Sequence, residues 1–361
     1  MENHPVVFVA RQPGSAAALA PVVRALQKET EIPCLVLGLD HAISAWSTAG
    51  ITAQAVASFH EARCHLTAIW PALLLTGTSF NAADDGLFWS WAWEQGIPSI
   101  AFVDHWTNYR KRFSSTPDRH FDCMPEQIAV IDDRMARRLV DAGCPEQRII
   151  MLGHPGWDDL VARRDDHTPK LRQELAGDRI LILFVSEPFA RFYGPKGTYS
   201  SLGYTEVDAL NLLFNVLETV GENLGETYTV IIKPHPRENS MDLTNLVMMA
   251  SGYQRVQARL VDGDRLELVA AAKVVTGMSS LLLYEAALMG RPVVALQPGR
   301  IAPSDLVDHY PGILLATEHG QAISALTHAL TGEISSIPAP KPVIPQWIKT
   351  IQNSLQRSPP R

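Results

Sequence analysis

The sequence has 361 residues, of which 46% are hydrophobic and 19% are charged, and its formal net charge is −7. This length is more than one typical core and favours two domains, and the composition is that of a soluble globular protein. The negative charge argues against a general affinity for nucleic acid. The longest apolar stretch, 66–75, is too short to span a bilayer and contains Pro71.

The amino-terminal residues have the pattern of a first strand and lack that of a signal peptide. The four cysteines form no CxxC pair, which predicts reduced thiols and no zinc site. These features favour a cytoplasmic protein. Peripheral contact with the inner face of the membrane remains open, because contact of that kind needs no spanning segment.

Strand and helix patterns alternate along the first 155 residues. The six expected strands are short, almost continuously apolar runs at 6–10, 34–39, 72–78, 99–105, 127–133 and 148–155. Continuous rather than alternating hydrophobicity is typical of strands that are buried on both faces of a parallel sheet. Alternation with helices predicts right-handed βαβ units.

A polar segment at 156–178 interrupts this pattern and is expected to be a connection with a short helix. The pattern then restarts, with strands expected at 179–187, 228–236, 255–262, 273–278 and 291–299. The restart predicts an α/β fold of two Rossmann-like, doubly wound parallel-sheet domains facing a cleft. We expect an acceptor-side domain at 1–160, a nucleotide-sugar-binding domain at 161–340, and a helix and tail at 341–361.

Ligands of open parallel sheets bind at the carboxyl ends of the strands, so the residues just after each strand are the first candidates. In the second domain, Lys233, His235 and Arg237 follow one strand within five residues. Several donors and positive charges in one loop suit a phosphate. The alternative is a solvated polar turn.

The segment TGMSSLLLYEAALMG provides a second anion-binding candidate. Ser279 and Ser280 stand where a helix begins, and Gly277 allows close approach of the backbone. The first turn of a helix leaves N–H groups unpaired and favours anions, although either serine could be only an N-cap. Glu285 is a candidate for binding the ribose hydroxyls, the alternative being a backbone or arginine partner.

Ser186 and Glu187 follow the first strand of the second domain and are candidates for the wall of the same site. The loop after them, rich in proline, glycine and aromatic residues, is either a lid or an insertion.

In the first domain, two carboxylate clusters compete for the role of general base. Asp84 and Asp85 precede a helix, where a carboxylate is stabilised as the anion but can also be an ordinary cap. Asp104 and His105 follow a buried strand and offer the second candidate base. The residues alone do not decide between these two clusters.

A basic run and the first strand end supply candidates for contacts with an acceptor or a donor sugar. Tyr109 and Arg110 begin a run that continues with Lys111 and Arg112, which suits an acidic sugar, a phosphate or anionic lipid, or a solvated turn. Gly14 and Ser15 lie after the first strand and face the same expected cleft.

The order of three short motifs resembles that of a known enzyme group. An acidic motif at 84–86, a His-Pro pair at 235–236 and a serine pair at 279–280 resemble the GT-B-fold bacterial sialyltransferase, Kdo-transferase and polysialyltransferase-like glycosyltransferases. The resemblance implies that the histidine and serine motifs hold the nucleotide phosphate and that the acidic motif supplies the base. It implies a metal-independent transferase without a cofactor, moving a sugar from a nucleotide donor, with a CMP-linked nonulosonic acid as one option, to a glycan, lipid or protein acceptor.

Other families share part of this pattern. The segments 14–26 and 153–160 also resemble UDP-N-acetylglucosamine 2-epimerases, and the motifs are similar to those of glycerophosphate transferases. The acidic and arginine sites of the epimerases are not found in the expected places, so glycosyltransferase is the leading expectation. The alternatives are a sugar-nucleotide 2-epimerase or hydrolase, a glycerol- or ribitol-phosphate transferase, and a non-catalytic nucleotide-sugar-binding protein.

Overall fold

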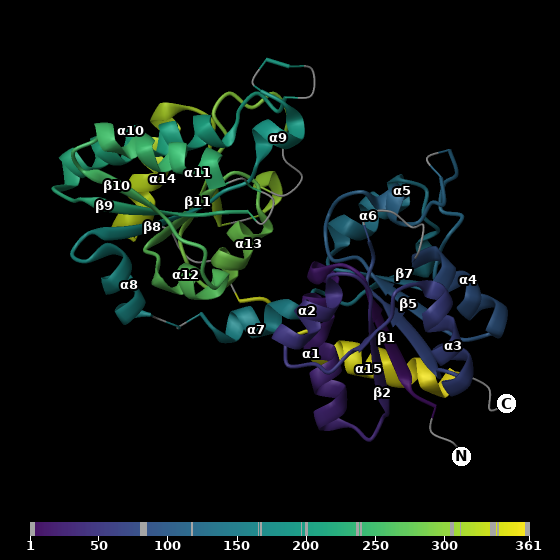
Figure 1. Cartoon of the computed structure of the whole chain (residues 1–361). Coiled ribbons are helices and arrows are strands. Elements are labelled where there is room, and N and C mark those ends of the chain that lie inside the picture. Colours follow the sequence, from purple (N-terminus) through teal and green to yellow (C-terminus); the bar gives the residue numbers. More distant parts are fainter. Residues whose placement is uncertain are drawn as a thin grey trace. The chain divides into compact units, whose positions relative to one another are not determined.

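Figure 1 shows the computed structural model of the chain. It describes residues 4–79, 85–116, 118–164, 166, 168–195, 197–198, 201–235, 238, 240–303, 307–310, 312–332, 337 and 339–357, with the side chains at 240–243, 309 and 357 excepted. Two predicted site residues, Asp84 and Arg237, lie outside the described residues. The chain divides into two compact units, the first made of residues 1–159 and 340–361 and the second of residues 160–339.

The first unit contains an all-parallel sheet, with seven strands among the described residues. In spatial order the strands are β3 (Gln54–Ala55), β2 (Cys34–Gly38), β1 (Val6–Ala10), β4 (Leu73–Thr76), β5 (Ser99–Phe102), β6 (Gln127–Val130) and β7 (Ile149–Met151). The strands β1, β4 and β5 are buried along their whole length, as continuously apolar sequences predict.

Helices connect these strands and pack against the sheet. They are α1 (Pro13–Glu29), α2 (Ala42–Thr48), α3 (Phe59–Ile69), α4 (Asp85–Gln95), α5 (Tyr109–Arg112), α6 (Asp133–Asp141) and α7 (Gly156–Ala162), with a 3-10 turn at Glu146–Arg148. The first unit is completed by the end of the chain. Helix α15 (Ile344–Arg357), yellow in Figure 1, lies against α1 and β4.

Helix α15 is held at two points. The carboxylate of Asp158 accepts hydrogen bonds from the backbone N–H groups of Val343 and Ile344, at 2.9 and 3.0 Å. The fully buried Trp347 donates its indole N–H to the carbonyl of Gly153 at 3.2 Å. The last segment therefore belongs to the core of the first unit, although more than 180 residues separate it from these partners.

The second unit repeats the plan with six parallel strands among the described residues. In spatial order they are β10 (Val256–Leu260), β9 (Tyr228–Lys233), β8 (Ile180–Val185), β11 (Val274–Gly277), β12 (Val293–Leu296) and β13 (Ile313–Ala316). The helical elements are α8 (Pro169–Ala176), α9 (Phe189–Tyr193), α10 (Glu206–Leu224), α11 (Ser240–Met248), α12 (Arg265–Ala271), α13 (Leu281–Leu288) and α14 (His319–Thr331), with 3-10 turns at Met249–Gly252 and Val307–His309.

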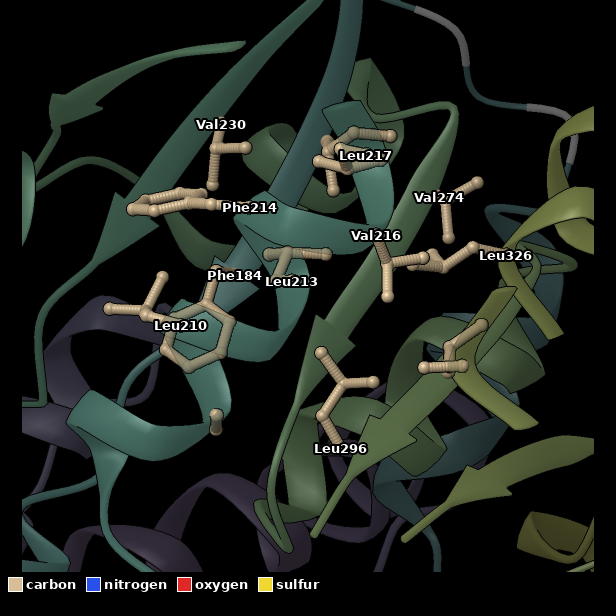
Figure 2. Packing of buried hydrophobic residues seen from close by; sticks show 14 of the residues in the cluster. Phe184, Leu210, Leu213, Phe214, Val216, Leu217, Val230, Val274, Leu296 and Leu326 are labelled. Atoms are coloured by element: carbon tan, nitrogen blue, oxygen red, sulfur yellow. The ribbon is translucent and has the colours of Figure 1, made fainter. Parts of the chain in front are cut away.

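The core of the second unit forms under α10 and α14, which pack side by side on one face of the sheet (Figure 1). Helix α10 begins with a capping box, in which Thr205 and Asp208 satisfy each other's backbone N–H groups. Its apolar face, including Leu213 and Phe214, meets strand residues such as Val230 (Figure 2). Burying each such side chain contributes about 1.5–3 kcal/mol, so the core fixes this helix on the sheet.

In both sheets the order in which strands are added reverses beside the first strand. In the first unit the chain builds β1, β2 and β3 to one side and then returns to place β4 beside β1. In the second unit it builds β8, β9 and β10 and then places β11 beside β8. The predicted α/β class with two parallel, doubly wound sheets is confirmed. At such reversals the connecting loops diverge and leave room for a ligand, so the ends of β1, β4, β8 and β11 are where each unit is expected to bind one.

Candidate functional site

At the carboxyl edge of the first sheet, a buried arginine holds an aspartate. Arg112, at the end of α5, donates from Nη1 to Oδ1 of Asp104 at 3.2 Å and to the hydroxyl of Thr78 at 2.7 Å. Its Nε donates to the carbonyl of Thr107 at 3.0 Å. The side chains of Arg112 and Asp104 are only 7% and 14% exposed. This is a desolvated ion pair in which the cation is well hydrogen-bonded, the condition under which buried charges are tolerated.

The structure brings Asp104 together with the predicted residues of the first strand end. A β-carbon added to Gly14 would lie 3.2 Å from Oδ2 of Asp104. Ser15, almost fully buried, donates its hydroxyl to the carbonyl of Gln12 at 3.1 Å. Gly14 therefore lies next to the carboxylate that follows β5, and Ser15 comes after it in the first turn of α1.

His105 is mostly buried beside the same pair. Its Nδ1 lies 3.1 Å from the hydroxyl of Thr107. Burial lowers the pKa of His105 below its ordinary value, the charge of Asp104 raises it, and the charge of Arg112 lowers it. A histidine in this setting is mainly neutral near pH 7, so it can accept or donate a proton through its other ring nitrogen.

Asp85 has a structural partner. One of its carboxylate oxygens accepts the backbone N–H of Ser79 at 2.6 Å, which ties the start of α4 to the loop after β4. Burial raises the pKa of Asp85 to about 6, and the Ser79 hydrogen bond and the charges of Arg11 and Arg112 oppose that rise. The carboxylate is therefore engaged in holding the loop, whereas Asp84 lies outside the described residues.

The basic run after β5 divides between the interior and the surface. Arg110 is exposed and donates from Nε to the carbonyl of Ala142, at the end of α6, at 3.0 Å. Tyr109 is partly buried at the start of α5. Arg112, which was not singled out above the rest of the run, is the member that reaches the strand ends.

In the second unit, the start of α13 already holds a carboxyl group of the chain itself. Glu187, just after β8, accepts the backbone N–H of Ser279 at 2.7 Å and the hydroxyl of Ser279 at 3.1 Å. The backbone N–H of Ser280 also stabilises this carboxylate, and the hydroxyl of Ser280 caps α13 by accepting the N–H of Leu282 at 3.3 Å. The predicted anion site at this helix start is thus capable of binding a carboxylate, here one from the chain itself.

The pKa of Glu187 reflects its setting. Burial raises the pKa of this carboxyl to about 7, hydrogen bonds from Ser279 and Ser280 lower it, and the nearby charge of Glu238 raises it. Glu238 belongs to the loop after β9. Its carboxylate accepts the hydroxyl of Ser186 at 2.5 Å and the backbone N–H of His235 at 2.5 Å. Two carboxylates therefore meet at the ends of β8, β9 and β11.

The remaining predicted residues of this edge have partners of their own. Lys233 lies 3.7 Å from the carboxylate of the exposed Asp262. The ring of His235 packs edge-on against Phe192, with centroids 6.2 Å apart. A β-carbon on Gly277 would lie 2.9 Å from the carbonyl of Val185, so only glycine lets β11 end this close to β8.

Glu285 is buried in α13 and forms an ion pair with Arg265 of α12. This is the arginine partner foreseen as the alternative to a ribose contact. Burial lowers the pKa of Arg265, and the charge of Asp264 raises it. The pair leaves Glu285 fixed in orientation at the second turn of α13.

Sequence reasoning missed Arg112 and Glu238. Arg112 looked like one of three equivalent solvated cations, and no local pattern distinguishes the member that turns inward. Glu238 stands in KPHPRE, where the cations suggested a phosphate site, and its carboxylate accepts the backbone N–H of His235 within the same loop.

The described residues were also examined for metal-binding clusters and membrane-spanning helices. Within the described residues, no three His, Cys, Asp or Glu side chains are grouped so that they could hold a metal ion. The helices of the described part include none that is both long and apolar enough to cross a membrane.

No family model and no curated protein sequence matches the chain. Solved structures do match it over nearly its whole length. The UDP-GlcNAc 2-epimerase from Methanocaldococcus jannaschii is similar with a TM-score of 0.71 at 12% identity, covering 97% of this chain and 99% of that one. The UDP-GlcNAc 2-epimerase from Neisseria meningitidis, bound to UDP-GlcNAc, gives 0.67 at 15% identity, covering 98% and 100%.

A third similar structure is Alr3699/HepE from Anabaena in complex with UDP and glucose, with a TM-score of 0.62 at 15% identity, covering 98% of this chain and 100% of that one. At such identities the likeness shows a shared fold. It agrees with the two-domain, GT-B-like plan expected from the sequence, and it gives no support to the sialyltransferase, Kdo-transferase and polysialyltransferase-like group. The chain has the fold of the UDP-GlcNAc 2-epimerase structures.

Proposed function

We propose that this protein is an enzyme that acts on a nucleotide sugar, and that it changes the configuration at carbon 2 of the sugar. The observation that carries the proposal is the start of α13, where Ser279 and Ser280 hold the carboxyl group of Glu187 at the point where the strand order of the second sheet reverses. Fold alone does not define function. Here the fold shared with the 2-epimerase structures and the anion-binding strand end support the same function.

The nucleotide's phosphate would take the place of the Glu187 carboxylate on Ser279. A phosphate oxygen suits the same backbone N–H and hydroxyl donors, and the partial positive charge of the helix start favours it. Lys233 and His235, at the end of the neighbouring strand β9, supply further donors, and Glu285 is the candidate for the ribose hydroxyls. Glu187 can leave as a neutral carboxyl, because burial raises its pKa to about 7.

The chemistry is assigned to the first unit. Changing the configuration at carbon 2 by proton transfer breaks the C2–H bond, and the electron pair forms a C1–C2 double bond as the C1–O bond to the nucleotide diphosphate breaks. A proton then returns to the other face of carbon 2 as the C1–O bond forms again, and these two transfers need a base and an acid near that carbon. Asp104 offers the better base, because it is oriented by Arg112 while Asp85 is engaged with Ser79. His105, mainly neutral near pH 7, is the candidate partner.

A first test is a thermal-shift screen with UDP, CMP, CDP, GDP and ADP. We expect the largest rise in melting temperature with UDP, since a ligand that binds the folded state stabilises it by mass action. A preference for CMP would instead favour a glycosyltransferase that uses a CMP-linked donor. No shift with any of the five would contradict a nucleotide site.

The second candidate is a metal-independent glycosyltransferase with a glycan, lipid-linked or protein acceptor. The oriented carboxylate of Asp104 favours it as well, because a transferase needs a base for the acceptor hydroxyl. The products formed from UDP-GlcNAc without acceptor separate the two. The epimerase gives the C2 epimer, a hydrolase gives free sugar, and a transferase leaves the substrate unchanged until an acceptor is added. Running the assay with and without a chelator tests the expected independence of metal.

A further inference from the structure

Arg112 differs from its neighbours in the basic run. Lys111 and Arg110 are exposed, whereas the side chain of Arg112 is 7% exposed and lies behind the strand ends. Burying a guanidinium is costly unless it is paired and hydrogen-bonded. Its position therefore requires a compensating set of contacts, and these contacts are all at the carboxyl edge of the first sheet.

The guanidinium is fixed by partners from two loops. The loop after β4 contributes the hydroxyl of Thr78 at 2.7 Å and its carbonyl at 3.3 Å. The loop after β5 contributes the carbonyl of Thr107 at 3.0 Å and Oδ1 of Asp104 at 3.2 Å. The planar fork of an arginine satisfies several acceptors at fixed angles, which a lysine cannot do. Arg112 thus joins the two loops in one geometry.

The two carboxylate oxygens of Asp104 have different surroundings. Oδ1 is held by Arg112, while Oδ2 points to Gly14, where an added β-carbon would be 3.2 Å away. Gly14 lies in the first turn of α1, a helix of 17 residues whose amino-terminal end favours a negative charge. Oδ2 is therefore the oxygen left for a reacting proton.

The backbone after β5 is shaped so that Arg112 can turn back. Asn108 adopts a left-handed conformation, with φ of 63°, and its carbonyl accepts the N–H of Arg112 at 3.0 Å. Trp106 anchors the loop by donating to Oδ2 of Asp132 at 2.9 Å. Left-handed backbone is uncommon for residues other than glycine and often occurs at functional sites.

We infer that Arg112 is the positioning residue of the reaction, which orients Asp104 so that Oδ2 exchanges the proton with the sugar. This inference rests on the proposed function and adds to it. Arg112 acts through Asp104 and touches no substrate atom. Its loss would leave the nucleotide site of the second unit intact and misplace the carboxylate.

The test compares Arg112→Gln, Arg112→Lys and Gly14→Ala with the wild type, measuring kcat and KM for UDP-GlcNAc, the Kd for UDP and the melting temperature. We expect Arg112→Gln to lower kcat by about 10- to 100-fold, the size of effect caused by a misplaced catalytic group, with KM and the UDP Kd within about threefold. Arg112→Lys should recover part of the loss. Gly14→Ala should lower kcat more modestly while Arg112 stays in place, because the new methyl group presses on Oδ2 and shifts it by a few tenths of an ångström.

Arg137→Gln is the matched control, since Arg137 forms an exposed ion pair with Asp133 on α6. The inference is overturned if Arg112→Gln keeps kcat within twofold, or if KM rises while kcat is unchanged. Should Arg112→Gln fail to fold, Arg112→Lys and Gly14→Ala decide the question by the same criteria.

NMR titration of His105 separates failure of this inference from failure of the proposed function. The charge of Arg112 contributes to lowering the pKa of His105, so Arg112→Gln should raise that pKa and Arg137→Gln should not. If the wild type shows no turnover but the His105 shift is observed, the proposed function is wrong and the arrangement around Asp104 stands. An unchanged His105 would contradict the arrangement itself.

Discussion

The carboxyl edges of the two sheets use opposite means to hold a carboxylate. In the first unit a buried cation, Arg112, holds Asp104. In the second unit the backbone N–H groups of loops and of a helix start hold Glu187 and Glu238. The sheets have the same winding, so the difference comes from the loops after the strands.

The two ways of holding a carboxyl group suit different chemical roles at the two edges. A carboxylate held by an arginine keeps its charge and its orientation, as a base requires. A carboxylate on N–H donors, with its pKa raised by burial, is an anion that a better anion can replace. We therefore expect the first edge to be preorganised for proton transfer and the second to exchange Glu187 for a phosphate.

Replacing the carboxylate of the first edge should have the largest effect. Asp104→Asn keeps the shape but removes the base, so we expect kcat to fall by about 10²- to 10⁴-fold with little change in the UDP Kd. Steady-state kinetics on UDP-GlcNAc checks this, and the surface change Asp133→Asn is the control. A loss smaller than threefold would show that Asp104 is not the base and that the two edges are less different than we describe.

The pH dependence of stability tests the second edge. The pKa of Glu187 is raised from 4.5 to about 7 in the folded protein, so its contribution to stability is fully present below about pH 4.5 and is lost as the pH rises through 7. Over that window the wild type should lose about 3 kcal/mol relative to Glu187→Gln. Urea unfolding at pH 4.5 and pH 8 measures the difference. Parallel pH profiles for the two proteins would contradict a carboxyl with a raised pKa.

The affinity for UDP should show directly whether a phosphate replaces the Glu187 carboxyl group. Glu187 lies near Glu238 and Tyr204, and the charge of Glu238 adds to the rise of its pKa. At pH 8 a carboxyl with a pKa of about 7 is about 90% ionised, and its competition with phosphate weakens UDP binding by about tenfold. We expect Glu187→Gln to remove this penalty at pH 8 and to bind UDP like the wild type at pH 6. Calorimetry measures the UDP affinity at both pH values, with Glu222→Gln, an exposed position on α10, as the control. Replacement of Glu187 by the phosphate would be contradicted if the wild type bound UDP more tightly than Glu187→Gln at pH 8.

The smallest expected effect concerns Glu285. If it binds a ribose hydroxyl, Glu285→Ala should weaken UDP binding about fivefold, the value of one hydrogen bond, and should change the affinity for 2′-deoxy-UDP less. Equal losses for both nucleotides would mean that Glu285 serves only its ion pair with Arg265.

The sequence predicts the sheets well, because strands buried on both faces must be apolar along their length, as β1 and β8 are. It does not predict β3, whose residues Gln54 and Ala55 are exposed and carry no apolar signal, and the expected strands also leave out the edge strand β13 at Ile313–Ala316. The return of α15 to the first unit also escapes it, because the partners, Asp158 and Gly153, are far away in the sequence.

The candidate site is predictable in position and not in pairing. Strand ends pick out Asp104 in the first unit, and Glu187 and Ser279 in the second, as candidates for ligand contacts, because ligands of parallel sheets bind at these ends. Which side chain contacts which depends on the path of each loop. The left-handed turn that sends Arg112 inward is at Asn108, a residue type that tolerates this conformation, but an asparagine alone does not predict where the chain will use it.

Proton NMR of UDP-GlcNAc incubated with the wild-type protein in D₂O, without any acceptor, tests the proposed epimerisation at carbon 2. We expect the C2 proton signal to disappear and the C2 epimer to accumulate with deuterium at that carbon, because the proton leaves and a deuteron from the solvent replaces it. Unchanged UDP-GlcNAc, under conditions where UDP raises the melting temperature, would contradict the claim.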